Sequence, residues 1–323
     1  MKTIKTILAV LTVLLVLAGC QKKPVEEAVD VRFGVLKGPT GIGASYLLEK
    51  NDKNESSNHY VVTVAAEATD IVSQVISGQL DIAAVPTNVA STLYNKTEGG
   101  VQLLALNTAG VLYILEKGNS VNSIKDLAGK TVYSVGQGSN PEYVLNYILA
   151  SNGLKVGEDV EVKFLDSAEL TTKMAAGSVD VCMLPVPAVT TVLMKNTEVR
   201  IALNMTEEWN KLNNGSTLTM GCVVVRKEFA EKYPQAVEKF LKEYEESVNY
   251  VKSNVQDAAA LCEKFEIVPK AAVAARAIPD ANLIFVAGKD MKGYISGYYQ
   301  VLAQADIKSI GGKLPGDDFY YEK

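Results

Sequence analysis

Two segments of this chain repeat one another. Residues 75–86 (VISGQLDIAAVP) return as residues 174–185 (MAAGSVDVCMLP), so that Gly78 corresponds to Gly177, 99 positions later. Each segment has the pattern of a helix end, a glycine turn and a strand. The same displacement aligns Glu67 with Asp166, and a displacement of 100 aligns Gly38 with Gly138. The repetition predicts two similar lobes built from strands and helices.

Short apolar runs alternate with helical patterns in both halves, which favours parallel βαβ units and an α/β fold. We expect the chain to cross between the lobes twice, near residues 110–115 and 217–222. Residues 234–254 form an amphipathic helix pattern whose apolar stripe is typical of core packing. The predicted lobes are residues 31–112 plus 218–323 for lobe 1 and residues 113–217 for lobe 2.

The N-terminus has the pattern of a secretory leader. Lys2 and Lys5 precede an apolar run, residues 7–16, that is shorter than the roughly 20 residues a membrane span needs. The run closes in Leu-Ala-Gly-Cys at residues 17–20, which resembles the lipobox of bacterial lipoproteins. That resemblance implies a signal peptide at residues 1–19, lipidation of Cys20 and an extracytoplasmic, membrane-anchored protein. Residues 20–30 are polar and suit a tether.

Charge and cysteine content narrow the partners and the chemistry. A formal charge of −5 and a pI near 5.2 leave no basic face, which argues against nucleic acid as a partner. Cys182 and Cys222 lie in apolar, strand-like runs, so we expect buried free thiols there. For Cys262 a disulfide stays open.

The sequence offers little to an enzyme. His59 is the only histidine and follows a polar run, which suggests a solvated loop, and no Cys/His spacing is typical of a metal site. The glycine loop at residues 38–43 (GPTGIG) fails both nucleotide-binding fingerprints. We therefore predict no catalytic residue, no cofactor and no metal. Glycines there instead allow a ligand to approach backbone amides at a helix N-terminus.

Ligands of open parallel sheets lie beyond the carboxyl ends of the strands. Applied to both lobes, this rule selects six loops, at residues 38–42, 67–70 and 86–88 and at residues 138–140, 166–168 and 185–187. The predicted ligand-binding residues in and beside these loops are Gly38, Pro39, Thr40, Gly41, Ile42, Glu67, Thr87, Asn88, Gly138, Ser139, Asn140, Tyr143, Ser167 and Pro187.

The composition of these loops constrains the ligand. None contains arginine, and Lys37 is the only lysine nearby, so an anion would depend on backbone amides and hydroxyls. Glu67 and Asp166 either accept hydrogen bonds from an amine or a ring N–H, or cap their helices. Tyr143 and Trp209 are candidate stacking partners for a ring, with packing as the alternative.

Four segments in order resemble the substrate-binding lipoproteins of ABC importers: residues 33–41 (FGVLKGPTG), 78–83 (GQLDIA), 126–132 (DLAGKTV) and 223–229 (VVVRKEF). The resemblance is to the nitrate, sulfonate and taurine type, which includes binders of the thiamine pyrimidine precursor. It implies a type 2 periplasmic-binding-protein-like fold of two lobes, each with a mainly parallel sheet flanked by helices and joined by two hinge crossovers. It also implies a monomer that closes on one small molecule and docks on a permease served by an ATPase.

The arginine-poor loops favour a small polar or heteroaromatic metabolite over nitrate or a sulfonate. Two alternatives stay open: an enzyme of the thiamine-pyrimidine-synthase-like branch, which the single histidine and the lipobox oppose, and a tethered ligand sensor without transport. The sequence does not identify the ligand or the permease.

Overall fold

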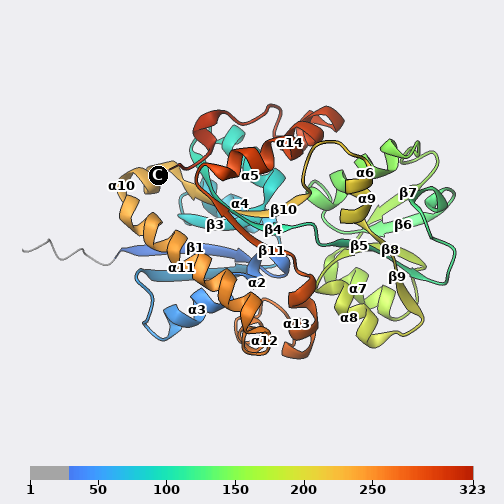
Figure 1. Cartoon of the computed structure of the whole chain (residues 1–323), viewed down its shortest axis with the longest axis horizontal. Helices are drawn as coiled ribbons and strands as arrows, with labels where there is room; N and C mark the ends of the chain where they lie inside the picture. The colour runs from blue at the N-terminus through green and yellow to red at the C-terminus, as the bar shows by residue number, and fades with distance from the viewer. Residues whose placement is uncertain (1–28, 323) are drawn as a thin grey trace, which may run out of the picture.

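The computed structural model describes residues 29–322, which form two β-sheets with helices around them (Figure 1). Lobe 1 is built on a six-stranded sheet of order β11-β4-β10-β3-β1-β2, and lobe 2 on a five-stranded sheet of order β7-β6-β8-β5-β9. The strands of lobe 1 are β1 (Asp30–Leu36), β2 (His59–Ala65), β3 (Ile82–Pro86), β4 (Val101–Ala109), β10 (Thr219–Arg226) and β11 (Leu283–Ala287). Those of lobe 2 are β5 (Leu112–Lys117), β6 (Thr131–Ser134), β7 (Glu161–Phe164), β8 (Val181–Pro185) and β9 (Val199–Asn204).

The two-sheet α/β architecture confirms the predicted fold class, but each sheet is mixed and less parallel than expected. In lobe 1 the strand β1 pairs in parallel with β2 and β3, whereas β10 runs antiparallel to both β3 and β4. In lobe 2 the strand β6 pairs in parallel with β7 and β8, whereas β5 runs antiparallel to β8 and β9. Most antiparallel pairs involve β5 and β10, which enter their sheets from the other lobe, and β11 also runs antiparallel to β4.

Helices cover both sheets. Lobe 1 carries α2 (Pro39–Ile42), α3 (Ser45–Asp52), α4 (Ala68–Ile76), α5 (Thr87–Lys96) and, after β10, α10 (Lys227–Lys232), α11 (Pro234–Ser253), α12 (Val255–Lys264), α13 (Ala271–Ala277), η2 (Ile278–Asp280), α14 (Asp290–Ala305), η3 (Ile307–Ile310) and η4 (Asp317–Phe319). Lobe 2 carries η1 (Ile124–Leu127), α6 (Asn140–Ser151), α7 (Ser167–Ala175), α8 (Ala188–Lys195) and α9 (Met205–Lys211). Among residues 29–322 no helix has both the length and the apolar character of a membrane span.

The sequence repeat is a structural repeat. The bounds of α4 and β3 (68, 76, 82 and 86) recur in α7 and β8 (167, 175, 181 and 185), a constant displacement of 99 residues. The turn glycines also match, since Gly78 has φ 73° and Gly177 has φ 71°, in the left-handed region that glycine enters without strain. The repeated pattern therefore encodes the same helix, turn and strand in both lobes.

The chain passes between the sheets at two places. Residues 110–111 connect β4 of lobe 1 to β5 of lobe 2, and residues 212–218 lead from α9 back to β10. The amide of Asn282 donates to the carbonyl of Gly110 at 2.5 Å, which ties the first connection to the segment before β11. Both connections are short, and thus the lobes remain close to one another.

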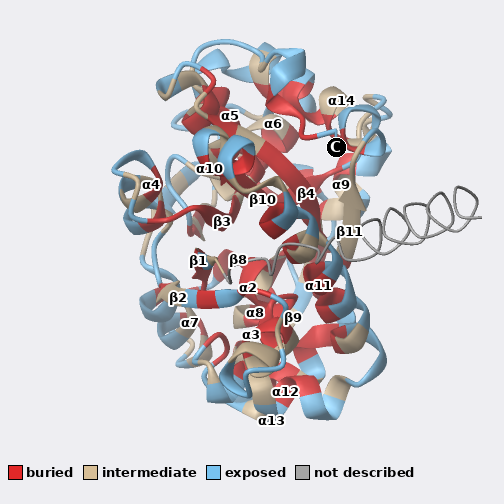
Figure 2. Cartoon of the chain, turned by 90° about the vertical axis from the view of Figure 1, so that its left-hand side faces the viewer, coloured by how far each residue is buried: buried red, intermediate tan, exposed pale blue. Residues whose placement is uncertain are grey.

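Each sheet is buried between its helices, as the red inner strands of Figure 2 show. The apolar face of α11 packs on the lobe 1 sheet, where the ring centroids of Phe240 and Phe33 are 5.1 Å apart. This confirms core packing for the amphipathic pattern of residues 234–254. The stripe also buries Glu243, whose carboxylate accepts a hydrogen bond from Tyr60 at 2.7 Å.

Cys182, Cys222 and Cys262 are buried free thiols. The prediction for Cys182 and Cys222 is confirmed, and the question left open for Cys262 is answered by its lack of a disulfide. Burial raises the pKa of the Cys182 thiol to about 12 and that of Cys262 to about 11. These thiols therefore stay protonated at neutral pH and behave as small apolar side chains.

Candidate ligand-binding cleft

The loops at the carboxyl ends of the parallel strands bring the two lobes together. The loop between β3 and α5 in lobe 1 meets the loop between β6 and α6 in lobe 2, where the amide of Asn88 donates to the carbonyl of Gly138 at 3.4 Å. The loop after β2 lies near the loop after β7, because Asp166 is close enough to raise the pKa of Glu67. Loops selected from the sequence thus face one another in two pairs.

Asn140, the first residue of α6, has the densest contacts with the opposite lobe. It is fully buried, and its side-chain amide donates to Thr87 Oγ1 at 2.9 Å and to the carbonyl of Met220 at 2.8 Å. Its backbone N–H donates to Asn88 Oδ1 at 3.1 Å, and its Oδ1 accepts from the hydroxyl of Tyr298 at 3.1 Å. All four partners belong to lobe 1, so Asn140 joins the lobes.

Thr87 and Asn88 are held in the same network. Thr87 Oγ1 donates to the carbonyl of Thr219 at 2.6 Å, and the Asn88 amide donates to the carbonyl of Ser309 at 3.2 Å. Both residues are buried. In this conformation both side chains bind protein groups at the place where the lobes meet.

The glycine loop after β1 is shaped by close backbone contacts. Gly38 has φ 96°, caps the short helix α2 and donates its N–H to the carbonyl of Ile267 at 3.0 Å. A Cβ on Gly41 would lie 2.1 Å from the carbonyl oxygen of Leu36, so only glycine fits there. Pro39 is half-buried, while Thr40 and Ile42 are buried. The loop is therefore a tight strand-to-helix turn with its amides at a helix start.

Glu67 and Asp166 differ in what their carboxylates do, although they occupy equivalent positions. Asp166 Oδ1 accepts from the N–H groups of Ala168 and Glu169 at 2.8 and 3.2 Å, which is an N-cap, whereas Glu67 makes no side-chain cap. Burial raises the pKa of Glu67 above its ordinary value, and the charges of Asp166 and Asp70 raise it further. The capping alternative thus describes Asp166, and Glu67 is left directed across the cleft.

The remaining predicted residues lie around this region with different exposure. Gly138 and Ser167 are exposed, Ser139 and Tyr143 are half-buried, and Pro187 is buried after a cis peptide bond. Burial, followed by the charges of Glu142 and Asp306, raises the pKa of Tyr143. Because Tyr143 is only half-buried, a ligand could reach its ring.

Trp209 is a packing residue and not a stacking partner for a ligand. It is fully buried, its indole N–H donates to Ser216 Oγ at 3.1 Å, and its ring lies 5.0 Å from that of Tyr147 and 5.4 Å from that of Tyr298. Because Tyr298 belongs to α14 of lobe 1, the indole packs where the two lobes meet. The sequence alone could not separate this role from ligand stacking.

His59 is the first residue of β2 instead of a loop residue. Its Nδ1 lies 2.8 Å from Asp30 Oδ1, and the ring is exposed. The amino end of β2 is the end opposite to Glu67, so His59 lies at the far end of a seven-residue strand from the cleft loops. Among the described residues no group of three or more His, Cys, Asp and Glu side chains is placed to hold a metal ion.

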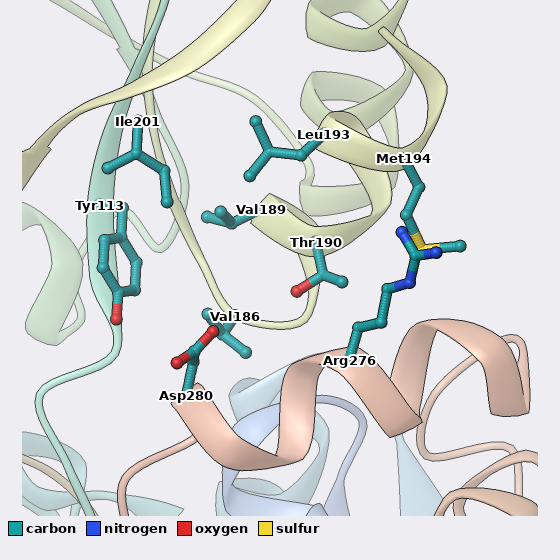
Figure 3. Close-up of a pocket in the computed structure, with 9 residues that line it drawn as sticks. All are labelled: Tyr113, Val186, Val189, Thr190, Leu193, Met194, Ile201, Arg276 and Asp280. Atoms are coloured by element: carbon teal, nitrogen blue, oxygen red, sulfur yellow. The ribbon is translucent and has the colours of Figure 1, made fainter. Parts of the chain in front are cut away.

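A pocket of about 340 Å³ opens between the lobes on the side of α8 and α13 (Figure 3). Residues of β5, α8 and β9, together with Val186 between β8 and α8, form its lobe 2 wall, and Arg276 and Asp280 form its lobe 1 wall. Sequence analysis missed this pocket. The alanine-rich stretch that forms α13 carried no signal of a site, and neither charged residue lies in a loop at the carboxyl end of a strand.

The fold defines a class that solved structures share. An ABC transporter protein from Parabacteroides distasonis superposes with a TM-score of 0.75 at 22% identity, covering 91% of this chain and 99% of that one. The periplasmic aliphatic sulphonate binding protein SsuA from Escherichia coli gives 0.69 at 18% identity, covering 88% and 89% of the two chains. The periplasmic nitrate-binding protein NrtA from Synechocystis PCC 6803 gives 0.61 at 15% identity, covering 90% and 83%.

The family is given by the sequence itself. Residues 62–258 match the model of the family described as NMT1/THI5 like. This match spans more than half of the chain, and the chain therefore belongs to the NMT1/THI5-like family. A comparison with curated proteins gives no match.

Proposed function

We propose that this protein is the substrate-binding component of an ABC importer and captures one small polar or heteroaromatic metabolite between its lobes. Membership of the NMT1/THI5-like family and the likeness to solved binding proteins for sulfonate and nitrate support the proposal. The observation that carries it is the meeting of equivalent loops, since Glu67 and Asp166 come from the same position of the repeat in opposite lobes.

Closure of the lobes is the proposed mechanism. A ligand held by one lobe gains contacts from the other only when the lobes are shut, so it shifts the population by its difference in affinity for the two states. The buried network of Asn140 provides a contact between the lobes that does not need the ligand. Part of the free energy that favours the closed state thus comes from contacts between the lobes, and the ligand supplies the rest.

The chemistry of the cleft supports a ligand with N–H groups. Glu67 directs a carboxyl group across the cleft, and no arginine lies in the six loops. A ligand amine or ring N–H placed between Glu67 and Asp166 would donate to their carboxylates and relieve their repulsion. We assign the hydroxyl of Thr40 to a polar group on the other side of the ligand.

We further propose that Cys20 anchors the protein outside the cytoplasm and that residues 1–19 are removed; both lie outside the described residues. The proposed boundaries are a tether at residues 20–30, lobe 1 at residues 31–112 plus 218–323 and lobe 2 at residues 113–217. The protein would work as a monomer with a permease and an ATPase. Labelling cells with a fatty acid tests the anchor, because Cys20→Ser should abolish the label and Cys262→Ser should leave it unchanged.

The enzyme and sensor alternatives receive no specific support from the structure. Histidine chemistry in the cleft would need an imidazole near the loops, and His59 lies at the far end of β2. The structural relatives named above are binding and transport proteins. Binding without turnover is therefore the proposed activity.

Thermal-shift screening of the purified protein against vitamins, pyrimidines, amino acids and sulfonates tests the function. One ligand class should raise the melting temperature, increasingly as its concentration exceeds its Kd. Thr40→Ala should weaken the binding of that ligand, whereas Thr63→Ala, in the middle of β2, should leave its affinity unchanged. The absence of any stabilising ligand from these four classes would contradict the transport proposal.

A further inference from the structure

The pocket beside α8 and α13, which we call the flank pocket, has walls from different lobes. Of the residues that line it, only Val186 belongs to a loop assigned to the imported ligand, the one at residues 185–187. Figure 3 shows Arg276 and Asp280 rising from the α13–η2 segment towards α8, with Val189 and Leu193 facing them. A molecule in the flank pocket would therefore touch lobe 1 and lobe 2 at once, at a place separate from the Glu67 side of the cleft.

The lobe 2 wall is apolar. Val189 and Leu193 line it from α8, Val186 lines it from the segment just before α8, and Met194 and Ile201 extend it. Met194 and Ile201 are 39% and 43% exposed, which makes them two of the few large apolar side chains that this protein leaves open to water. Covering this wall with an aliphatic group would bury apolar surface, at about 25 cal/mol per Å².

The lobe 1 wall carries two opposite charges that are not paired with each other. Arg276 and Asp280 are four residues apart, a spacing that allows an ion pair on one helix face. Within residues 29–322, neither side chain has a hydrogen bond or an ion pair. Figure 3 shows why: Arg276 extends towards Met194, whereas Asp280 turns towards Val186. Each charge is thus available to a ligand.

Tyr113 adds a polar group next to Asp280. It lines the pocket from β5, and its pKa is raised by burial and then by the negative charge of Asp280. The phenol is therefore neutral at physiological pH and can act as a donor or acceptor. An ammonium group between Asp280 and Tyr113 would meet a carboxylate and a phenolic oxygen.

We propose that the flank pocket binds an apolar α-amino acid. Arg276 takes the carboxylate in the paired geometry that guanidinium favours, and Asp280 takes the ammonium group. The aliphatic side chain lies on the lobe 2 wall. Because both charges stand on one wall and the apolar surface on the other, the ligand needs both charged groups at one end. The volume, about 340 Å³, lies at the small end of ligand pockets, which suits a single amino acid.

This assignment goes beyond the proposed import function and does not depend on it. An amino acid in the flank pocket contacts both lobes, so its binding free energy depends on their relative position. Occupation would therefore favour one arrangement of the lobes, whichever metabolite the cleft takes. Small-angle X-ray scattering with and without the amino acid would detect that change in shape.

Isothermal titration calorimetry of the purified protein with four six-carbon probes tests the proposal. L-norleucine carries both charges at one end, its isomer 6-aminohexanoate carries them at opposite ends, and hexanoate and hexylamine carry one each. L-norleucine should bind at least about 10-fold more tightly than the other three, since each charged contact that is lost is worth about that factor. Equal or tighter binding of 6-aminohexanoate would contradict the assignment of both charges to one wall.

Variants then locate the probe. Arg276→Gln should weaken L-norleucine about 10-fold or more and leave hexylamine unchanged, and Asp280→Asn should weaken L-norleucine and leave hexanoate unchanged. Lys252→Gln, on the exposed face of α11, is the charge-matched control and should have no effect. All three substituted side chains are exposed, so folding is not at risk.

A cleft variant separates this proposal from the import function. Thr40→Ala should leave L-norleucine binding unchanged. If Thr40→Ala removed L-norleucine binding and Arg276→Gln did not, the amino acid would lie in the cleft and the flank pocket assignment would be wrong. Absence of any heat with L-norleucine at millimolar concentration would overturn it as well, without bearing on a ligand found for the cleft.

Discussion

Glu67 of lobe 1 and Asp166 of lobe 2 occupy positions that correspond in the repeat, and they lie close enough for Asp166 to raise the pKa of Glu67. Asp166 caps α7, because its Oδ1 accepts from the backbone N–H groups of Ala168 and Glu169. Glu67 has no such cap and lies near the Asp166 carboxylate. The repeat has therefore placed two acidic groups near one another, and we expect the contact between the lobes to respond to protonation of Glu67.

The contact between lobes should weaken as pH rises through the raised pKa of Glu67. The pKa is raised first by burial and then by Asp166, so the contact state binds a proton more tightly than separated lobes do. Its stabilisation is complete below the ordinary pKa of 4.5 and is lost as pH increases above the raised value. Glu67→Gln should remove this dependence, as measured by scattering across pH 4–8.

Charge-matched variants separate this effect from others. Glu245→Gln, on the exposed face of α11, changes the net charge equally and should keep the pH dependence of the unaltered protein. Asp70 and Glu169 lie on the two helices that begin at this contact, and Asp70 itself adds to the raised pKa. A Glu67→Gln protein that still opened with rising pH would assign the effect to those neighbours.

The two aspartates of the repeated turn should respond very differently to the same substitution. Asp81 is 2% exposed and accepts from Arg32 Nε at 2.8 Å and from Arg226 at 3.0 Å, whereas Asp180 is exposed. Asp81→Asn leaves two guanidinium groups without their carboxylate and should lower the free energy of unfolding by about 3 kcal/mol. Asp180→Asn should change it by less than about 0.5 kcal/mol. Urea unfolding measures both.

Asp81 should also contribute to acid unfolding. Burial alone would raise its pKa, but the hydrogen bonds from Arg32 and Arg226 outweigh burial and hold the pKa below the ordinary value of 3.8. Its stabilisation is therefore present above pH 3.8 and is lost as pH falls through the lowered value. In Asp81→Asn the free energy of unfolding should therefore fall less steeply at acid pH than in the unaltered protein. An unchanged pH dependence would argue against the ion pair.

Asn140→Ala should loosen the lobes. The substitution removes three of the four hydrogen bonds that Asn140 makes and leaves the carbonyl of Met220 and the hydroxyl of Tyr298 unpaired in a buried place. A loss of about 1–3 kcal/mol follows from such unsatisfied groups. We expect a lower melting temperature and a larger radius of gyration. Ser139→Ala, at the neighbouring residue without a side-chain cap, should change neither property.

The sequence predicted those features that local chemistry decides. The turn at Gly78 requires a left-handed residue between a helix and a strand, and the same requirement at Gly177 made the repeat visible. Contacts between lobes depend on the angle at which two distant parts meet, which no short pattern encodes. For that reason the sequence placed Asn140 in a ligand loop but could not show that Thr87 and Tyr298 bind it. The sequence could not predict, for the same reason, that Arg276 faces apolar residues of the other lobe.

The repeated glycine turn should impose the same requirement on both lobes. Alanine at Gly78 or Gly177 must adopt φ near 70°, which costs about 1–2 kcal/mol, and the two losses should add because the sites lie in different lobes. Space is not the reason, since the nearest atoms to an added Cβ belong to flexible Arg226 and Lys117 side chains. Gly293→Ala is the control, because Gly293 lies within α14 with no atom within 4 Å of a new Cβ. That variant should gain about 0.5–1 kcal/mol of stability. Urea unfolding measures all three variants. Losses at the two turns together with a gain in the helix would show that the turn backbone requires glycine.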